Sequence, residues 1–220
     1  MQTFATTAPI TAVLDLPAGR VQLIAADRAD TTVEVRPADP ARNRDVRTAE
    51  QTTAVYRDGV LRIHTPETGN ALLGPGAVEV TLRLPAGSHV EARTAACELR
   101  VVGRLGDLAF DGVHRQAKID EAASVRLTAT DGDIGIGRLT GPADITTARG
   151  DIRITEAHHG TVTLTTRAGD ITVGAAPGAC AALDAATAHG RIANALRNDG
   201  TTTLDIRATT SHGDITAHSL

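Results

Sequence analysis

The clearest pattern in the chain is a short motif of alternating apolar and polar positions that recurs after residue 124. In each copy, alternating small or apolar residues lead to a polar corner built on Gly-Asp or a close variant, and further alternating positions follow. Five copies align without gaps: VRLTATDGDIGI (125–136), ADITTARGDIRI (143–154), VTLTTRAGDITV (162–173), LDAATAHGRIAN (183–194) and IRATTSHGDITA (206–217). Alternation on both sides of the corner predicts two β-strands per copy, each with one buried face.

Three positions are nearly constant among the copies. The residue after the corner is always isoleucine, with spacings of 18, 19, 21 and 23 residues, at Ile134, Ile152, Ile171, Ile192 and Ile215. Five residues earlier lies a small or β-branched residue: Ala129, Thr147, Thr166, Thr187 or Thr210. The corner residues are Gly132, Asp133, Gly150, Asp151, Gly169, Asp170, Gly190, Gly213 and Asp214, with Arg191 in place of the fourth aspartate. Glycine permits a positive φ and aspartate accepts hydrogen bonds from corner N–H groups, so we interpret these residues as structural.

Two all-β folds can accommodate this pattern. In a parallel β-solenoid, each copy is a coil of two strands, and equivalent positions stack along the axis. In an antiparallel meander or sandwich, each corner is a hairpin turn, and the five-residue offset forms a cross-strand pair. We favour the solenoid, because stacking explains why one position is isoleucine five times, and the period of about 20 residues is typical of a repeat protein.

The preceding part of the chain is a less regular version of the same element. A sixth copy, VEARTAACELRV (90–101), has Cys97 and Glu98 at the corner, and a degraded copy lies around residues 110–119. The turn L-x-L-P-A-G occurs at 14–19 and 82–87. We therefore expect one β-strand-repeat domain over residues 1–220, diverged over 1–89 and regular over 90–220. Polar segments at 37–52, with a short helical turn, and at 65–77 are predicted loops. We expect specific binding either at these loops or along the faces formed by stacked equivalent positions.

Composition narrows the possible partners. Phe4, Tyr56 and Phe110 are the only aromatic residues, which disfavours single-stranded nucleic acid and the aromatic subsites of sugar clefts. A net charge of -4 with dispersed Lys and Arg predicts no nucleic-acid partner and no attraction to anionic lipid. The opening residues lack a signal-peptide pattern, and no apolar run approaches the roughly 18 residues of a membrane span. We expect a cytoplasmic protein without membrane insertion, in which Cys97 and Cys180 are free thiols.

Three motifs invite a metal or adhesion interpretation. Arg149-Gly150-Asp151 spells RGD, but the same corner reads DGD, AGD, HGR and HGD elsewhere, so the turn explains it. The corner aspartates would form a row in a solenoid, yet calcium-binding coils use denser Asp patterns, and Arg191 interrupts the row. Four histidines are candidate metal ligands: His158, His159, His189 and His212. Adjacent strand residues point to opposite faces, so we predict no metal and no cofactor.

No catalytic constellation is recognisable either. A solenoid enzyme that cleaves acidic polysaccharide would need paired carboxylates, and none stands apart from the corner pattern. Ser124, Ser211 and Cys97 lack a nucleophile-elbow motif or a neighbouring base. We therefore predict no catalytic residues and no enzymatic activity.

The xGDI repeats, together with the segment EVRPADPARNRDVRTAEQT (34–52), resemble a bacterial β-strand-repeat family called "putative adhesins", domain of unknown function 4097, in its actinobacterial type. The resemblance covers most of the chain. It implies no catalytic residues and no known molecular activity. The family name suggests export, and the opening residues carry no recognisable export signal.

The function expected from these observations is a noncatalytic binding or scaffold module. Its partner would be another protein or a second copy, engaged through a C-terminal edge, because the last copy ends at Ala217 and only three residues follow. Alternatively, the irregular pair Thr216 and Ala217 blunts this edge and the chain stays monomeric. Two other functions remain open: a carbohydrate-binding or carbohydrate-active solenoid, and a regulatory protein that contacts an envelope sensor.

Overall fold

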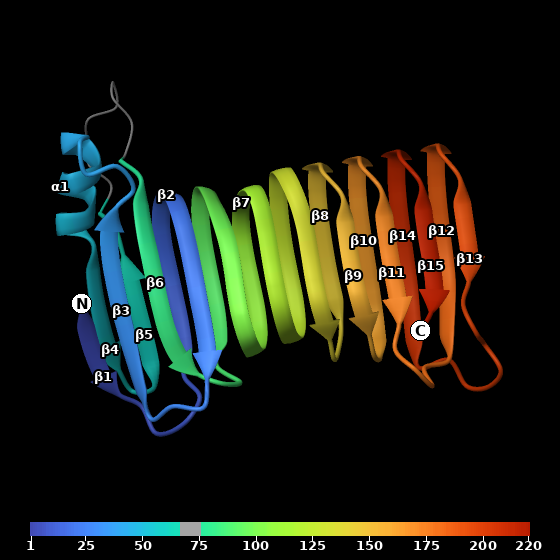
Figure 1. Ribbon diagram of the computed structural model, residues 1–220, viewed down its shortest axis with the longest axis horizontal. Coiled ribbons are helices and arrows are strands. Elements are labelled where there is room, and N and C mark those ends of the chain that lie inside the picture. The colour runs from blue at the N-terminus through green and yellow to red at the C-terminus, as the bar shows by residue number, and fades with distance from the viewer. Residues whose placement is uncertain (67–75) are drawn as a thin grey trace. The chain divides into compact units, whose positions relative to one another are not determined.

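The alternating segments form strands along almost the whole chain in the computed structural model, which describes residues 1–66 and 76–220 (Figure 1). Within these residues there are fifteen strands and one helix. The predicted loop at 65–77 lies largely outside the described residues. The chain separates into two compact units, residues 1–113 and 114–220, which are described in turn.

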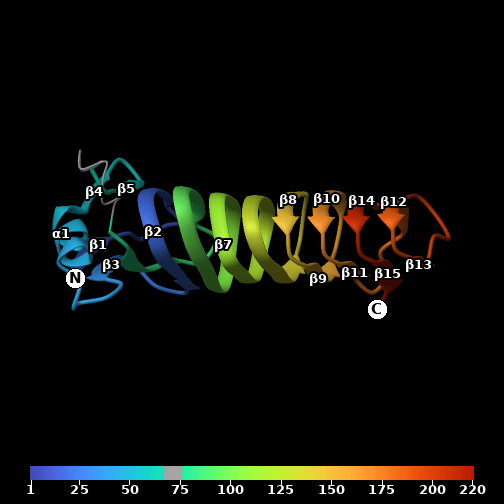
Figure 2. The same ribbon diagram turned by 90° about the horizontal axis from the view of Figure 1, so that it is seen from above.

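The second unit is a stack of two-stranded coils. Residues 125–139 of β7 (His89–Leu139) form one coil, and four pairs of strands form the others: β8 (Ala143–Arg149) with β9 (Ile152–Ala157), β10 (Gly160–Ala168) with β11 (Ile171–Ala175), β12 (Ala181–His189) with β13 (Ile192–Ala195), and β14 (Leu204–His212) with β15 (Ile215–Ser219). The first strands line one side and the second strands the other (Figure 2). Every strand pair described in this unit is parallel. The solenoid prediction is therefore confirmed, and the antiparallel meander is excluded for these coils.

The coils do not stack in the order of the sequence. The coil β14–β15 lies between β10–β11 and β12–β13, so the fourth coil along the chain is the outermost one (Figure 1). The prediction that the last coil, ending at Ala217, forms the open edge is wrong. Asn194 and Ala181 of the outer coil occupy positions that Ala217 and Leu204 hold in the inserted coil. Enclosing the more apolar coil on both faces removes more apolar surface from water.

The core of this unit is made of equivalent side chains in register. The corner isoleucines pair in the order Ile134, Ile152, Ile171, Ile215 and Ile192. The first four are at most 1% exposed, whereas Ile192 is 46% exposed. Each coil therefore covers the apolar side of its neighbour, and among the five coils described here only the outer one, β12–β13, lacks a cover on one side.

The first unit combines parallel coils with antiparallel strands. Its elements are β1 (Gln2–Ala5), β2 (Thr11–Ala26), β3 (Asp30–Pro37), α1 (Asn43–Gln51), β4 (Thr53–Arg57), β5 (Val60–His64), β6 (Val78–Pro85) and residues 89–113 of β7. β2 pairs in parallel with β5, β6 and β7. β1, β3 and β4 run antiparallel to their neighbours. The predicted short helical turn within 37–52 is a nine-residue helix, α1.

The sixth copy lies in this unit as a regular coil. Cys97 pairs with Gly19 of β2, and Glu98 pairs with Arg20. The Arg20 guanidinium donates to Glu98 Oε2 at 3.0 and 3.1 Å. Cys97 is buried, and this burial raises the pKa of its thiol to about 11. Both cysteines are free thiols, as predicted.

Candidate functional site

The corners of the second unit are joined by a row of hydrogen bonds from coil to coil. One carboxylate oxygen of each aspartate accepts the backbone N–H of the equivalent residue in the next coil. Asp133 accepts from Asp151 at 3.0 Å, Asp151 from Asp170 at 2.8 Å, and Asp170 from Asp214 at 2.7 Å. Finally, Asp214 accepts from Arg191 at 2.8 Å. Each aspartate thus satisfies a corner N–H group that would otherwise need water.

Arg191 ends this row and does not interrupt it. Because β14–β15 is inserted, Asp214 follows Asp170 in space and Arg191 comes last. Within the part of the chain that the structure describes, no coil stacks beyond Arg191. No N–H group of a further coil therefore needs an acceptor here, so an aspartate is not required at this position.

The other constant positions also serve the stack. The hydroxyls of Thr166, Thr210 and Thr187 donate to glycine carbonyls of the adjacent coil at 3.0 to 3.3 Å. A Cβ on Gly169 would lie 2.1 Å from the carbonyl oxygen of Gly150. Coils can therefore approach closely only where the corner lacks a side chain. The structure places the four corner aspartates in this row of hydrogen bonds, and a Cβ on any of the five corner glycines would lie 1.9 to 2.3 Å from a backbone carbonyl oxygen.

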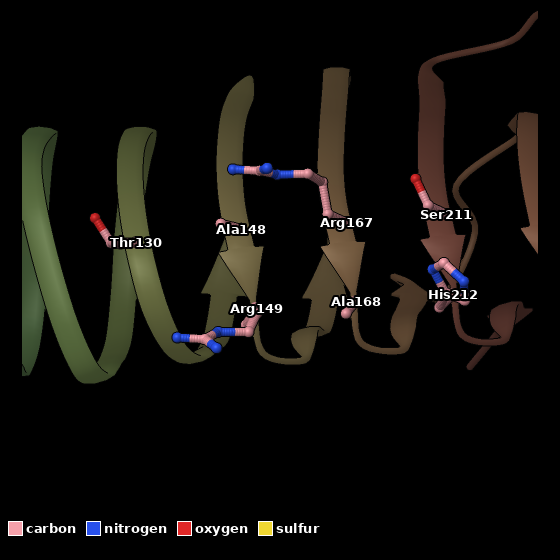
Figure 3. Close-up of a pocket in the computed structure, with 7 residues that line it drawn as sticks. All are labelled: Thr130, Ala148, Arg149, Arg167, Ala168, Ser211 and His212. Atoms are coloured by element: carbon pink, nitrogen blue, oxygen red, sulfur yellow. The ribbon is translucent and has the colours of Figure 1, made fainter.

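An open pocket of about 550 Å³ lies beside the corners on the outer surface (Figure 3). It is lined by Thr130, Ala148, Arg149, Arg167, Ala168, Ser211 and His212. Ala148 and Ala168 are short, so the longer side chains around them leave an open space. Every polar side chain of the lining can donate a hydrogen bond, and Arg149 Nη2 is held 2.9 Å from Asp131 Oδ2.

Sequence reasoning missed this pocket because its residues occupy variable positions. Thr130, Ala148, Arg167 and Ser211 follow the constant small residue in their copies, and they share one register position across the coils. Aligning the copies groups these four outward positions, but Ser211 lies beside Arg167 only because β14 pairs with β10. The Arg149 of the RGD tripeptide lies here, with its guanidinium engaged by Asp131.

The histidines are distributed over several places. His189 and His212 stack with ring centroids 4.8 Å apart, and His158 Nε2 lies 3.1 Å from Glu156 Oε1. Among residues 1–66 and 76–220, no group of three or more His, Cys, Asp or Glu side chains could hold a metal ion.

The outer coil presents an open sheet edge. β12 and β13 pair only with the inserted coil among the strands described. All four residues of β13 are exposed, including Ile192. The two strands read AALDAATAH and IANA, so Asp184 is their only Asp, Glu, Lys or Arg residue, and His189 ends β12. Natural edge strands are commonly protected by Lys, Pro or bulges, and these two strands contain neither Lys nor Pro.

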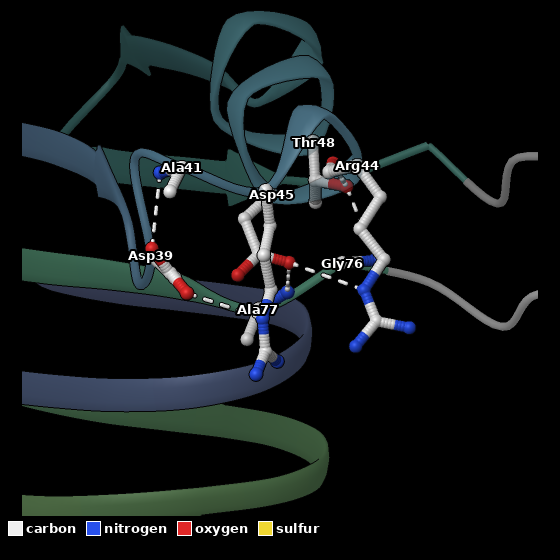
Figure 4. Close-up of polar contacts among 8 residues, drawn as sticks. Asp39, Ala41, Arg44, Asp45, Thr48, Gly76 and Ala77 are labelled. Atoms are coloured by element: carbon white, nitrogen blue, oxygen red, sulfur yellow. Dashed lines mark hydrogen bonds and ion pairs between the residues drawn. The ribbon is translucent and has the colours of Figure 1, made fainter.

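A polar clamp holds one chain segment of the first unit against α1 (Figure 4). Asp45 is 2% exposed, and its Oδ1 accepts the N–H of Ala77 at 3.0 Å. Thr48 Oγ1 accepts the N–H of Gly76 at 3.2 Å and donates to the carbonyl of Arg44 at 2.8 Å. The helix thereby fixes the backbone that enters β6, and its buried polar side chains are used for folding.

The sequence matches the family model described as Toastrack DUF4097 over residues 16–218. The chain belongs to the DUF4097 toastrack family. A crystal structure of "a putative adhesin" from Bacteroides fragilis matches with a TM-score of 0.52 at 11% identity, over 98% of this chain and 95% of that chain. A "putative cell adhesion protein" from Clostridium sporogenes matches with a TM-score of 0.37 at 11% identity, over 100% of this chain and 98% of that chain.

The family match and the B. fragilis structure support the fold and assign no activity. The description of the matching family model names no activity, and none of the curated proteins matches the sequence. The B. fragilis structure confirms the architecture alone, because its sequence is so distant. No helix in the described residues has the length and apolar character needed to cross a membrane.

Proposed function

We propose that the chain is a noncatalytic binding or scaffold module that engages a protein partner, or a second copy, through the open edge of β12 and β13. The observation that carries this proposal is the exposure of the outer coil. Its inner residue Ile192 is 46% exposed, whereas the equivalent isoleucines of the other coils are at most 1% exposed. An added strand pair would cover this surface and satisfy the free backbone groups of the edge.

The chemistry of the edge favours a partner that adds strands. Asp184 is the only Asp, Glu, Lys or Arg residue of β12 and β13, so little electrostatic repulsion opposes a neighbouring strand. The outward residues Ala182, Ala186 and Ala188 are small, whereas their neighbours on β14 are Asp205, Thr209 and Ser211. The edge therefore offers backbone hydrogen bonds with little steric hindrance, as strand-addition sites do.

Light scattering over a hundredfold range of concentration tests self-association through this edge. Asn194→Lys places a charge at an inner position, because Asn194 is in register with the buried Ala217. Ala193→Lys is the matched control, since Ala193 is in register with Thr216 and faces outward. Burying an unpaired lysine is costly, so Asn194→Lys should weaken association at least ~10-fold while the control changes it little.

Equal association of both variants would place the contact elsewhere. A strict monomer for the unmodified chain would exclude a second copy as the partner. The edge would then bind a different protein. Capture of a protein by the unmodified chain and by Ala193→Lys, but not by Asn194→Lys, would support this.

A second candidate function is binding of an acidic saccharide in the corner pocket. Its polar side chains can all donate hydrogen bonds, and they include Arg149, Arg167 and His212. Calorimetric titration with a uronate oligosaccharide and a neutral oligosaccharide of equal length tests this candidate. Binding of the uronate alone, lost in Arg167→Ala and kept in Arg153→Ala on β9, would support it. Equal binding by the two variants would exclude the pocket.

A further inference from the structure

The inserted coil is enclosed by segments that precede it in the sequence. β14 pairs with β10 on one side and β12 on the other, and β15 pairs with β11 and β13. Its inner residues Leu204, Ile206, Ala208, Ile215 and Ala217 are at most 1% exposed. Residues 204–220 therefore fill a slot between two coils that the chain builds from residues 160–195.

Both walls of the slot fit the inserted coil in one register. Ala208 pairs with Leu164 on β10 and with Ala185 on β12. Ile215 pairs in the same way with Ile171 and Ile192. The fit is thus set by strand pairing and side-chain stacking, and it does not require the covalent link to the preceding coil.

The polar contacts of the slot likewise depend on the segment and not on its connection. The N–H of Asp214 donates to Asp170 Oδ1 at 2.7 Å, and Asp214 Oδ1 accepts from Arg191 at 2.8 Å. Thr210 Oγ1 donates to the carbonyl of Gly169 at 3.1 Å. A separate molecule with the sequence of residues 204–220 can make each of these contacts.

We propose that the slot between β10–β11 and β12–β13 is an acceptor site for a strand-corner-strand segment, and that a second copy of this chain supplies it by exchanging residues 204–220. The slot lies on the inner side of the outer coil. The proposal therefore does not use the open edge, and it stands or falls separately from the function proposed above.

The connection at 196–203 controls how often exchange occurs. Residues 198–202 are exposed, and a short flexible connection holds its coil at an effective concentration on the order of millimolar. At micromolar protein, each copy should fill its own slot. Exchange should become measurable when the connection is cut, or when chains fold together at concentrations near the effective one.

A nicked protein tests the acceptor site directly. A protease site is placed among residues 198–202 of the full chain, and the folded protein is cleaved there. The nicked protein is then unfolded and refolded with a tenfold excess of a fluorescent peptide of residues 203–220. Mass action predicts that roughly nine-tenths of the protein carries the labelled peptide. A control peptide with Ile206→Asp and Ile215→Asp should be retained at less than a tenth of that level.

Uncut chain carried through the same cycle defines full recovery. Nicked protein that recovers its β-sheet signal without holding either segment would overturn the proposal, because the outer coil would then stack on β10–β11 without the insert. Nicked protein that fails to recover while the uncut chain does would also overturn it.

A second measurement asks whether a second copy supplies the coil. The uncut chain is refolded near millimolar concentration and then diluted. Exchanged dimers should persist after dilution and should form equally with Asn194→Lys, whereas dimers formed through the open edge should dissociate and should be lost in that variant. Monomers alone after dilution would overturn exchange between copies, whatever the edge does.

Discussion

The aspartate row predicts that two equivalent corner residues contribute very differently to stability. Asp170 accepts the N–H of Asp214 from the next coil at 2.7 Å. Arg191 occupies the same register position in the outer coil, where its N–H donates to Asp214 and its side chain extends into solvent. We compare Asp170→Ala with Arg191→Ala, and we use Asp170→Asn as a variant that keeps an acceptor oxygen.

The expected magnitudes follow from the contacts that each variant removes. Asp170→Ala removes a hydrogen bond to a charged acceptor, an interaction that is commonly worth about 1.5–3 kcal/mol. Because Asp170 is exposed, water partly replaces the carboxylate, and we expect a loss of about 1–2 kcal/mol. Arg191→Ala removes only an ion pair of 3.5 Å whose arginine side chain is 90% exposed, and such pairs contribute below ~0.5 kcal/mol. Asp170→Asn should fall between the two.

Hydrogen exchange at the amide of Asp214 gives the local readout, and thermal unfolding gives the global one. A loss of about 1.4 kcal/mol corresponds to tenfold faster exchange, and each kcal/mol lowers Tm by roughly 2–4 °C for a chain of this size. Equal effects of Asp170→Ala and Arg191→Ala, on either measurement, would refute the assignment of Arg191 to the end of the row. So would slower exchange of Asp214 in Asp170→Ala.

Four further outcomes are expected. Gly169→Ala should lower the free energy of unfolding by at least ~2 kcal/mol in a denaturant titration, because φ is +150° and the added Cβ would meet a backbone oxygen at 2.1 Å. Cys97 should resist iodoacetamide at pH 8 while partly exposed Cys180 reacts, since a pKa of about 11 leaves about 0.1% thiolate. The folded pKa of Cys97 lies above the ordinary value of 9.0, so its contribution to stability should be complete below pH 9 and decline as the pH rises toward 11. Asp45→Ala should cost about 1–3 kcal/mol by thermal unfolding, and Asp45→Asn should cost less, because the N–H of Ala77 would lose its buried acceptor only in the first variant.

Much of the second unit could be predicted from the sequence, because its information is local and repeated. The constant isoleucine and the constant glycine indicate that equivalent positions of successive coils lie against each other, since an isolated hairpin would require neither residue. The pocket could not be predicted, because it depends on which outward side chains become neighbours across coils. The polar segment at 37–52 predicts a loop with one helical turn, whereas the structure has a nine-residue helix there. Its helix α1 depends on contacts distant in sequence, such as the bond from Ala77 to Asp45.

The stacking order of the coils differs from their order in the sequence, and the reason is physical. Copies of one motif share a register, and coil 204–219 pairs in that register both with 160–175 and with 181–195. Periodicity alone therefore leaves the stacking order open. The simplest expectation is that coils stack in the order of the sequence. Burial favours a different order, because it encloses Leu204 and Ala217 of the inserted coil, whereas Ala181 and Asn194 hold the equivalent positions in the outer coil.

The two departures from the motif in the fourth copy now have a common explanation. Arg191 replaces an aspartate where no further N–H needs an acceptor, and Asn194 replaces an apolar residue where no further coil covers the position. In a solenoid, the copy with a broken polar row and a polar inner residue thus marks the outermost coil, wherever it lies in the sequence. The same substitutions make the exposed side of that coil less apolar and leave its backbone groups accessible, because Asp184 is the only Asp, Glu, Lys or Arg residue on its two strands. The backbone hydrogen bonds of the edge determine how a partner strand is oriented, and the small apolar area limits the affinity. Association through this edge should consequently be reversible and dependent on concentration, unlike the exchange of residues 204–220, which encloses a complete coil on both faces.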